Sequence, residues 1–157
     1  MTREEQIEAI STILRGESFA VFSFAGAAAG EPPYSAVMFF AETPGTRLMF
    51  GTSAGTMKGP YLRTGNGACA QIDTRGVGLE NMSQFARVTV QGRLRRIDQE
   101  PERTQAIDAY VAKLPNAKVF VARPGVDIYL LEPSHAVCAR GLMDRFEIDF
   151  PAGPAQV

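Results

Sequence analysis

The sequence is poor in residue types that would assign it quickly to a class of protein. It has two cysteines, one histidine and no tryptophan. Cys69 and Cys138 lie too far apart to fit a disulfide framework or a zinc signature, so reduced thiols in a cytoplasm are the expected state. Sixteen Lys and Arg residues against seventeen Asp and Glu residues give a net charge of −1. That balance predicts attraction to neither nucleic acid nor an anionic membrane.

Long apolar segments and familiar catalytic spacings are missing too. No stretch approaches the roughly 18 to 20 apolar residues of a membrane-spanning helix. The amino terminus carries early acids, unlike a signal peptide. Spacings typical of a Ser-His-Asp triad, paired carboxylates or metal ligands do not occur. The stretch GTSAGTMK, residues 51–58, lacks the Gly-Lys-Ser/Thr ending of a Walker A loop. A nucleoside triphosphatase is therefore not expected.

The length and the apolar pattern indicate one mainly β domain. A chain of 157 residues can bury a core without disulfides or metals. We expect a single domain over residues 1–150 that starts with an amphipathic helix at residues 1–16, followed by a flexible tail at residues 151–157. Short runs rich in β-branched and aromatic residues predict strands at 18–25, 34–41, 47–51, 68–73, 85–97 and 127–132, with further strands within 136–139 and 145–150.

The connections between these runs favour antiparallel pairing in a small barrel. The linkers GAAAGEPP and ETPGT have the chemistry of hairpin turns. Barrel closure removes the exposed edges that many short strands would otherwise present. Two helices are expected between strands, one near residues 57–64 and one at residues 99–113. For the latter, Asp98 is the expected N-cap and Pro101 lies near the first turn.

The loop before residues 57–64 is a candidate anion site. Pro60 requires the helix to begin just before it, so unpaired backbone N–H groups would face outward there. Thr52, Ser53 and Thr56 add hydroxyl groups, and Lys58 adds a positive charge. These residues predict a phosphate clamp. The alternative is that the hydroxyl residues cap a helix and that Lys58 is merely solvated.

Two segments resemble the pyridoxamine 5'-phosphate oxidase-like proteins, a family of FMN-binding split β-barrels. The first is FGTSAGTMK, residues 50–58, where a strand ending in aromatic and hydroxyl residues leads to a lysine. The second is RVTVQGRL, residues 87–94, which is similar to a long strand of the family. The order of elements matches over roughly residues 8–133. The resemblance implies an antiparallel split β-barrel with flanking helices, and FMN bound between two subunits.

The resemblance also implies which residues would contact the flavin. The strand at residues 34–41 would lie along the isoalloxazine ring, and the loop at residues 51–58 would surround the ribityl chain and the phosphate. Arg87 would reach the flavin across a dimer interface. The implied cofactor-binding residues are Tyr34, Ser35, Ala36, Val37, Met38, Gly51, Thr52, Ser53, Met57, Lys58 and Arg87.

Departures from the family pattern argue against a true pyridoxamine phosphate oxidase. The family's oxidases carry an Arg-Lys pair where this chain has Met57 and Lys58, so Arg63 or Arg87 would have to supply the missing cation. Those oxidases also use a carboxy-terminal tryptophan and arginine for the substrate, and this chain has no tryptophan. The catalytic residues and the substrate stay unknown.

Other members of the same fold degrade haem or use a deazaflavin, so FMN is the first of three cofactor candidates. His135 is the sole histidine and fits a surface or capping residue better than an iron ligand. Cys138 fits a small buried hydrophobe. The two functional readings are an FMN-dependent oxidoreductase acting on an unknown small molecule, and a non-catalytic binder of flavin or haem. Some apolar residues exceed the needs of one barrel, and one face of their strands is expected to pack on a second copy, which predicts a homodimer. They are Met38, Phe39, Phe40, Phe85, Val88 and Val90.

Overall fold

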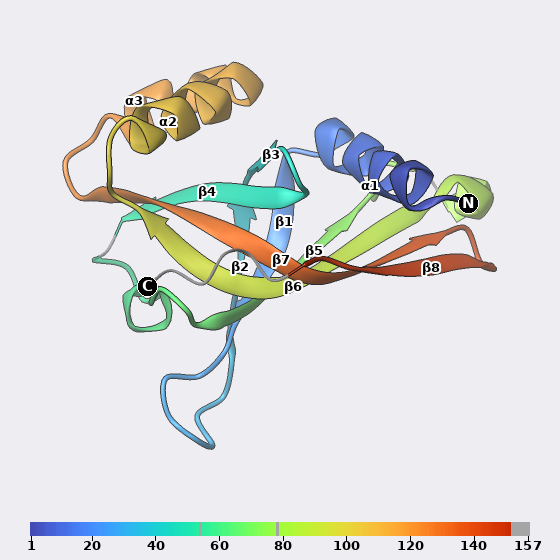
Figure 1. Cartoon of the computed structure of the whole chain (residues 1–157), viewed down its shortest axis with the longest axis horizontal. Coiled ribbons are helices and arrows are strands. Elements are labelled where there is room, and N and C mark those ends of the chain that lie inside the picture. The colour runs from blue at the N-terminus through green and yellow to red at the C-terminus, as the bar shows by residue number, and fades with distance from the viewer. Residues whose placement is uncertain (54, 78, 152–157) are drawn as a thin grey trace.

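The protein folds into one curved antiparallel sheet with helices at its ends (Figure 1). The computed structural model describes residues 1–53, 55–77 and 79–151. Its strands are β1 Phe19–Phe24, β2 Tyr34–Phe39, β3 Ala41–Thr43, β4 Arg47–Ser53, β5 Gly67–Asp73, β6 Ala86–Ile97, β7 Val126–Arg140 and β8 Asp144–Asp149. The predicted class, a mainly β split barrel with flanking helices, is confirmed. Nearly all of the predicted tail lies outside the described residues.

The helices are few and short. They are α1 Arg3–Gly16, α2 Glu102–Lys113 and α3 Lys118–Val121, with 3-10 turns at Gly59–Tyr61, Leu79–Gln84 and Pro115–Ala117. In α1, Thr2 and Glu5 form a capping box, which satisfies two backbone donors at the helix start. None of the helices in the described ranges is long and apolar enough to cross a membrane.

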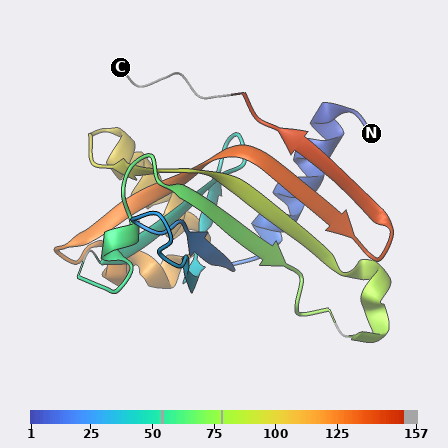
Figure 2. The same ribbon diagram turned by 90° about the horizontal axis from the view of Figure 1, so that it is seen from below.

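The strand order leaves the barrel split. The sheet runs β2-β1-β5-β6-β7-β4-β3, and β8 pairs with β7. Each pairing is antiparallel. The sheet curls so that β1 and β2 come opposite β4, which the views in Figures 1 and 2 agree on. Since β2 pairs with β1 alone, its other edge faces the gap towards β4.

Aromatic residues from both sides of the curl fill the barrel. The Phe22 ring of β1 lies 4.8 Å from the Phe50 ring of β4, measured between centroids, although three strands separate these two in the sheet. Phe50 also stacks on Tyr129 of β7 at 5.6 Å. Phe22 and Phe50 are completely buried. These contacts hold the two halves of the sheet face to face, with dispersion and burial as the driving forces.

A second apolar cluster lies on the outer face of β4 and β7, beneath α2 and α3. Side chains alternate along a strand, so Leu48 and Phe50 point into the barrel while Met49 points to the helices. Met49 packs there with Tyr110 of α2 and Val121 of α3. Both faces of β4 are therefore buried, which explains its continuous apolar run.

Two predicted strands are one continuous strand in the structure. β7 spans the predicted runs at 127–132 and 136–139, with Pro133 in its interior. Proline cannot donate to the ladder, and here it lies opposite Gly92 at a register shift between Gln91 and Gly92 of β6. The bulge removes the need for an N–H at Pro133. In contrast, the predicted strand 34–41 is interrupted at the buried Phe40, where β2 ends and β3 begins.

Two helix predictions need correction. The predicted helix at 57–64 is only the three-residue 3-10 turn Gly59–Tyr61, because Pro60 lacks the N–H that a longer helix would use. The second helix begins at Glu102 rather than Gln99, with Pro101 at the N-cap position and no side-chain cap. Asp98 is thus not the N-cap.

The bulge at Gly92 predicts a strong effect of a minimal substitution. A Cβ atom at residue 92 would lie 1.9 Å from the carbonyl oxygen of Glu132, so Gly92→Ala should lower the free energy of unfolding by about 1 to 3 kcal/mol, as overpacking does. Urea denaturation followed by circular dichroism measures this. Gly16→Ala is the matched control, because no atom lies within 4 Å of its added Cβ. Equal stability of the two variants would contradict the tight packing described.

Candidate functional site

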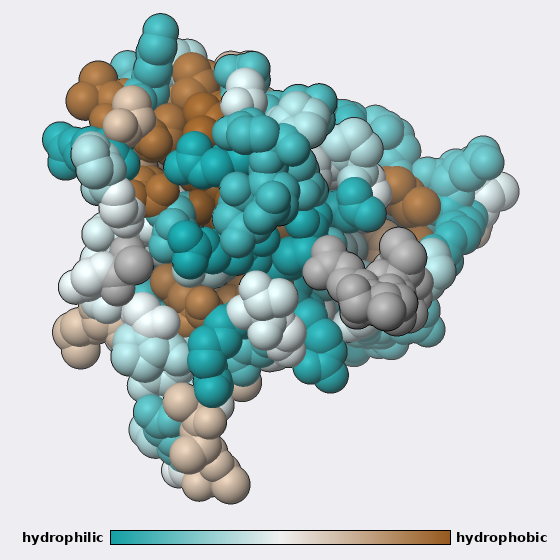
Figure 3. Space-filling view, turned by 60° about the vertical axis from the view of Figure 1, so that its left-hand side comes forward, coloured by the Kyte–Doolittle hydropathy of each residue, from teal (hydrophilic) through white to brown (hydrophobic). Residues whose placement is uncertain are grey.

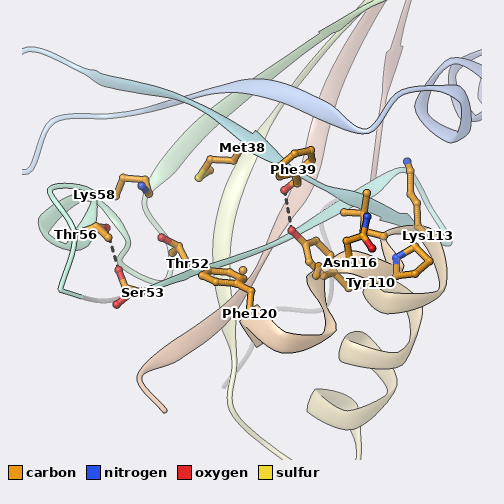
Figure 4. A pocket seen from close by; sticks show the side chains of 14 residues that line it. Met38, Phe39, Thr52, Ser53, Thr56, Lys58, Tyr110, Lys113, Asn116 and Phe120 are labelled. Carbon is orange, nitrogen blue, oxygen red and sulfur yellow. Dashed lines mark hydrogen bonds between the residues drawn. The ribbon is translucent and has the colours of Figure 1, made fainter. Parts of the chain in front are cut away.

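The gap between β2 and β4 opens into a cavity of about 710 Å³ (Figure 4). This volume lies within the range of roughly 300 to 1,000 Å³ that is typical of small-molecule sites. The end of β2, the end of β4 and the loop after it form one part of the wall. The other part comes from the carboxyl end of α2 and the segment that leads to α3.

Hydroxyl groups and an ammonium group gather at one end of the cavity. Ser53, Thr56 and Lys58 lie together there in Figure 4. The Thr56 hydroxyl donates to the Ser53 carbonyl oxygen at 2.9 Å, which fixes the turn after β4. The Lys58 side chain forms no hydrogen bond or ion pair with any residue in the described ranges. A single positive charge therefore stands at this end, and none of the lining residues is acidic.

This end differs from the predicted anion site in one respect. The expected helix N-terminus is a three-residue turn, too short to sum the peptide dipoles of a real helix. What remains of the prediction is the lysine charge, the hydroxyl groups and the backbone of a tight turn. Any attraction for an anion here must come from those groups.

Apolar side chains line the middle of the cavity. Met38 is buried, whereas Phe39 is 59% exposed at the cavity mouth. Phe120 of α3 forms the opposite side and points towards Thr52 in Figure 4. A Cβ atom at Gly51 would already touch Phe120 and Ile128, each at 3.4 Å. The absent side chain at Gly51 therefore keeps this part of the cavity open.

The far end of the cavity is fixed by α2. The Tyr110 hydroxyl donates to the Phe39 carbonyl oxygen at 3.3 Å, on the strand edge that β1 does not use. Burial raises the pKa of Tyr110, and a backbone hydrogen bond with Gly51 partly opposes that shift. Tyr110 thus remains a neutral hydroxyl that links α2 to β2 across the split.

Lys113 fastens the same end to the rest of the fold. Its ammonium group lies 2.5 Å from the Glu42 carboxylate and 2.7 Å from the Leu14 carbonyl oxygen. It also lies 4.3 Å from the centroid of the Phe40 ring, a favourable cation–π position. Although Lys113 lines the cavity, its charge is neutralised by Glu42. Lys58 is therefore the lysine whose charge faces the cavity without a carboxylate partner in the described part of the chain.

The structure brings part of the predicted site together. Met38, Gly51, Thr52, Ser53 and Lys58 all line the cavity. Their role in holding a cofactor stays a prediction.

The remaining predicted residues of β2 do not line the cavity. Tyr34 and Ala36 pack against the barrel core, and Tyr34 stacks on Tyr61 at 5.3 Å. Ser35 shares a hydrogen bond of 2.7 Å with Ser23, and Val37 is 63% exposed on the outer face of the sheet. The resemblance placed a whole strand beside the ring, but within one chain only the end of β2 reaches the cavity.

Two further predicted residues also lie elsewhere. Met57 is 78% exposed, and Arg87 is exposed on β6 opposite Asp73 of β5. Neither lines the cavity. The expectation that Arg87 of one subunit reaches the flavin of the other stays a prediction, because the structure contains a single copy of the chain.

Sequence reasoning missed the wall built by residues 110–120. Tyr110, Lys113, Asn116 and Phe120 face the cavity, yet they are far in sequence from the loop at 51–58. The sequence offered one indication: the apolar residues Leu114 and Phe120 follow a helix that already has an apolar face of its own, so they are expected to pack against another part of the protein. That signal does not say which cavity such residues line.

His135 and the cysteines lie outside the cavity. The Nδ1 atom of His135 lies 2.7 Å from the Asp149 carboxylate, which links β7 to β8. Cys138 is fully buried, and burial raises the pKa of both its thiol and that of Cys69. Both thiols are free. No cluster of three or more potential metal ligands occurs in residues 1–53, 55–77 and 79–151.

Comparison with known proteins gives structural matches only: no protein-family model and no curated protein sequence matches the chain. A haem binding protein from Mycobacterium smegmatis matches with a TM-score of 0.79 and 16% identity, over 95% of this chain and 60% of that one. This chain thus spans less than two thirds of that protein's length. A FAD binding protein from the same organism matches with a TM-score of 0.66 and 15% identity, over 96% and 98% of the two chains.

A third match comes from Clostridium acetobutylicum. It is a protein of the pyridoxinephosphate oxidase family, related to general stress protein 26, with a TM-score of 0.66 and 12% identity over 95% of this chain and 96% of that one. At such identities the likeness shows the fold alone. The fold that the sequence resemblance implied is confirmed: this chain is a split β-barrel, and its structural neighbours include a haem binding protein, FAD binding proteins and a protein of the pyridoxinephosphate oxidase family.

Proposed function

We propose that the cavity between β2 and β4 is an FMN site and that the protein is an FMN-dependent oxidoreductase acting on a small molecule. The observation that carries the proposal is the arrangement of the cavity. An ammonium group without a carboxylate partner among the described residues stands at one end, and an apolar slot leads away from it. FMN has the matching shape, a flat ring system joined by a flexible chain to a terminal phosphate.

The residues present fit such a ligand. Lys58 would pair with the phosphate, and the hydroxyls of Ser53 and Thr56 would donate hydrogen bonds to it, each charge-assisted bond contributing about 1.5 to 3 kcal/mol. Met38 and Phe120 would hold the ring between them. The open edge of β2 offers backbone donors and acceptors of the kind that a flavin ring edge requires.

The bound flavin would supply the hydride and electron chemistry. The chain's own residues would bind and orient it. Phe120 and Leu114 would exclude water from one side, and the neutral Tyr110 hydroxyl would keep α2 docked on β2. A side chain that must transfer a proton is not required by this scheme, and none is assigned.

Haem and a deazaflavin are the other cofactors considered. A haem binding protein is among the structural neighbours, but the cavity lining contains no histidine or cysteine that could bind iron, and His135 is held by Asp149 elsewhere. FAD binding proteins are neighbours as well. The lining, which lacks histidine and cysteine and has the Lys58 ammonium group at one end, favours a phosphate-bearing flavin over haem.

The first prediction concerns Lys58. If its ammonium group holds the phosphate, Lys58→Ala should weaken FMN binding by about 1.5 to 3 kcal/mol, roughly tenfold to 150-fold in Kd. Quenching of flavin fluorescence during titration of the apoprotein measures this. Lys118→Ala is the control, because Lys118 does not line the cavity. An unchanged Kd in Lys58→Ala would refute the phosphate assignment.

A second prediction separates an enzyme from a carrier. The FMN-loaded oxidoreductase should lose its flavin absorbance near 450 nm, an approximate property of oxidised flavin, when NADH or NADPH is added without oxygen. The colour should return when oxygen or an acceptor is admitted. A protein that binds FMN but is reduced by neither donor would instead fit the alternative, a non-catalytic flavin binder.

We further propose that the protein is a homodimer with the cofactor near the interface. Val37 and Phe39 are exposed on the outer face of β2, and the Phe39 ring meets Phe19 of β1 edge-on at 6.3 Å. The expectation of an exposed apolar face is wrong for Met38, Phe40, Val88 and Val90, which are buried in the core of the chain itself. Figure 3 shows apolar patches on the side of the molecule that carries α2 and α3. Phe39 is exposed beside Val37 and also lines the cavity. A second copy that packed on Phe39 would therefore contact the bound ligand.

The dimer predicts that a charge at Val37 separates the subunits. Val37→Lys should give a monomer in light scattering and should also weaken FMN retention, since the part of the border that the second copy supplies would be lost. Met143→Lys is the matched control, because Met143 is 94% exposed but lies between β7 and β8, outside β2, α2 and α3. A wild-type monomer that keeps one FMN per chain would contradict the shared site.

A further inference from the structure

A second cavity of about 590 Å³ lies on another face of α2. It is enclosed by α2, by α3 and by the turn at residues 122–125 that leads into β7. Helix α3 lies between the two cavities: Phe120 lines the first, and the next residue, Val121, lines the second. Helices α2 and α3 thus form a wall shared by two hollows that contain different residues. We call the second one the α2–α3 cleft.

The α2–α3 cleft is lined by three cations and one carboxylate. The cations are Arg103, Lys118 and Arg123, and the carboxylate is Asp108. Arg103 makes one long hydrogen bond to the Val126 carbonyl oxygen, at 3.3 Å. Lys118 and Arg123 form no side-chain hydrogen bond or ion pair with the described residues. Positive charge therefore collects around this hollow in a chain whose net charge is −1.

The neighbouring arginines of β6, unlike Lys118 and Arg123, are paired with carboxylates. Arg95 is paired with Glu102 and Glu132, at 2.7 and 2.8 Å, and Arg96 is paired with Asp127 at 2.9 Å. Glu102, Glu132 and Asp127 are therefore already engaged by the arginines of β6. The three cations of the cleft outnumber its one carboxylate, Asp108. A cleft with excess positive charge attracts an anion.

The floor of the cleft is apolar. Ile107 and Val111 of α2 face Val121 of α3 and Val126 at the start of β7. Val121 and Val126 are almost fully buried. A floor of this kind favours contact with the apolar part of a molecule, while guanidinium groups at the rim match the geometry of phosphate and carboxylate oxygens.

We infer that the α2–α3 cleft is a binding site for a small organic anion, a molecule that carries a phosphate or carboxylate group on an apolar body. The phosphate or carboxylate lies against Arg103, Lys118 and Arg123, and the apolar part lies over Ile107 and Val111. This site is independent of the proposed flavin site. It uses none of the residues that line the first cavity.

Titration with phenyl phosphate, followed by two-dimensional NMR of the ¹⁵N-labelled full chain already saturated with FMN, tests the inference. We expect saturable shifts of the backbone amides of residues 103–111 and 118–126. Benzoate in a parallel titration shows whether a carboxylate serves as well as a phosphate, and either ligand binding there supports the site. Phenol, which has the same ring without the charge, should bind at least about tenfold more weakly, since charge-assisted bonds are lost.

The double variant Lys118→Gln/Arg123→Gln should weaken phenyl phosphate binding by about tenfold or more. Both side chains are exposed, so its far-ultraviolet circular dichroism should match the wild type. The control is Arg47→Gln/Arg93→Gln, which removes two exposed charges outside the cleft and should leave binding unchanged. Shifts confined to residues 51–58, equal binding of phenol, or equal losses in both double variants would each overturn the inference.

Discussion

The free edge of β2 is the constraint on which the rest of the structure depends. A sheet in this order ends at β2 and β3 and would close into a barrel only if these two edges paired, but β2 bonds to β1 alone. Unpaired backbone groups in a buried gap are costly. Helix α2 supplies a partner for one of these backbone groups: the Tyr110 hydroxyl donates a hydrogen bond to the Phe39 carbonyl oxygen. The rest of the gap is left as the cavity, so the site follows from incomplete closure.

The helix segment 102–121 has a double role that comes from its position. Tyr110 and Lys113 fasten it to β2, β3 and α1, while Ala106 and Val121 pack on the outer face of β4 and β7. The same segment supplies one wall of each cavity. A change that moved this segment would alter both hollows. The two proposed sites share no residue, but one segment supports both.

Local charge matters more here than the total. The chain is almost neutral, and carboxylates neutralise many of its cations in exposed or half-buried pairs. Such pairs contribute little to stability when exposed. Within the described residues, no carboxylate pairs with Lys58, Lys118 or Arg123. These unpaired cations are more informative than the pairs elsewhere, because a positive group beside a hollow can bind an anion at low cost in reorganisation.

The sequence by itself determined the class of fold, most strand positions and the single chemical feature at Lys58. Periodicity of two and turn residues are local signals, and the run FGTSAGTMK needed no partner to be recognised. Only the tertiary structure decided that the strand at 34–41 breaks at Phe40, that Pro133 fits a bulge opposite Gly92, and that residues 110–120 form the second wall of the cavity. These depend on contacts between segments distant in the chain, which no local pattern encodes.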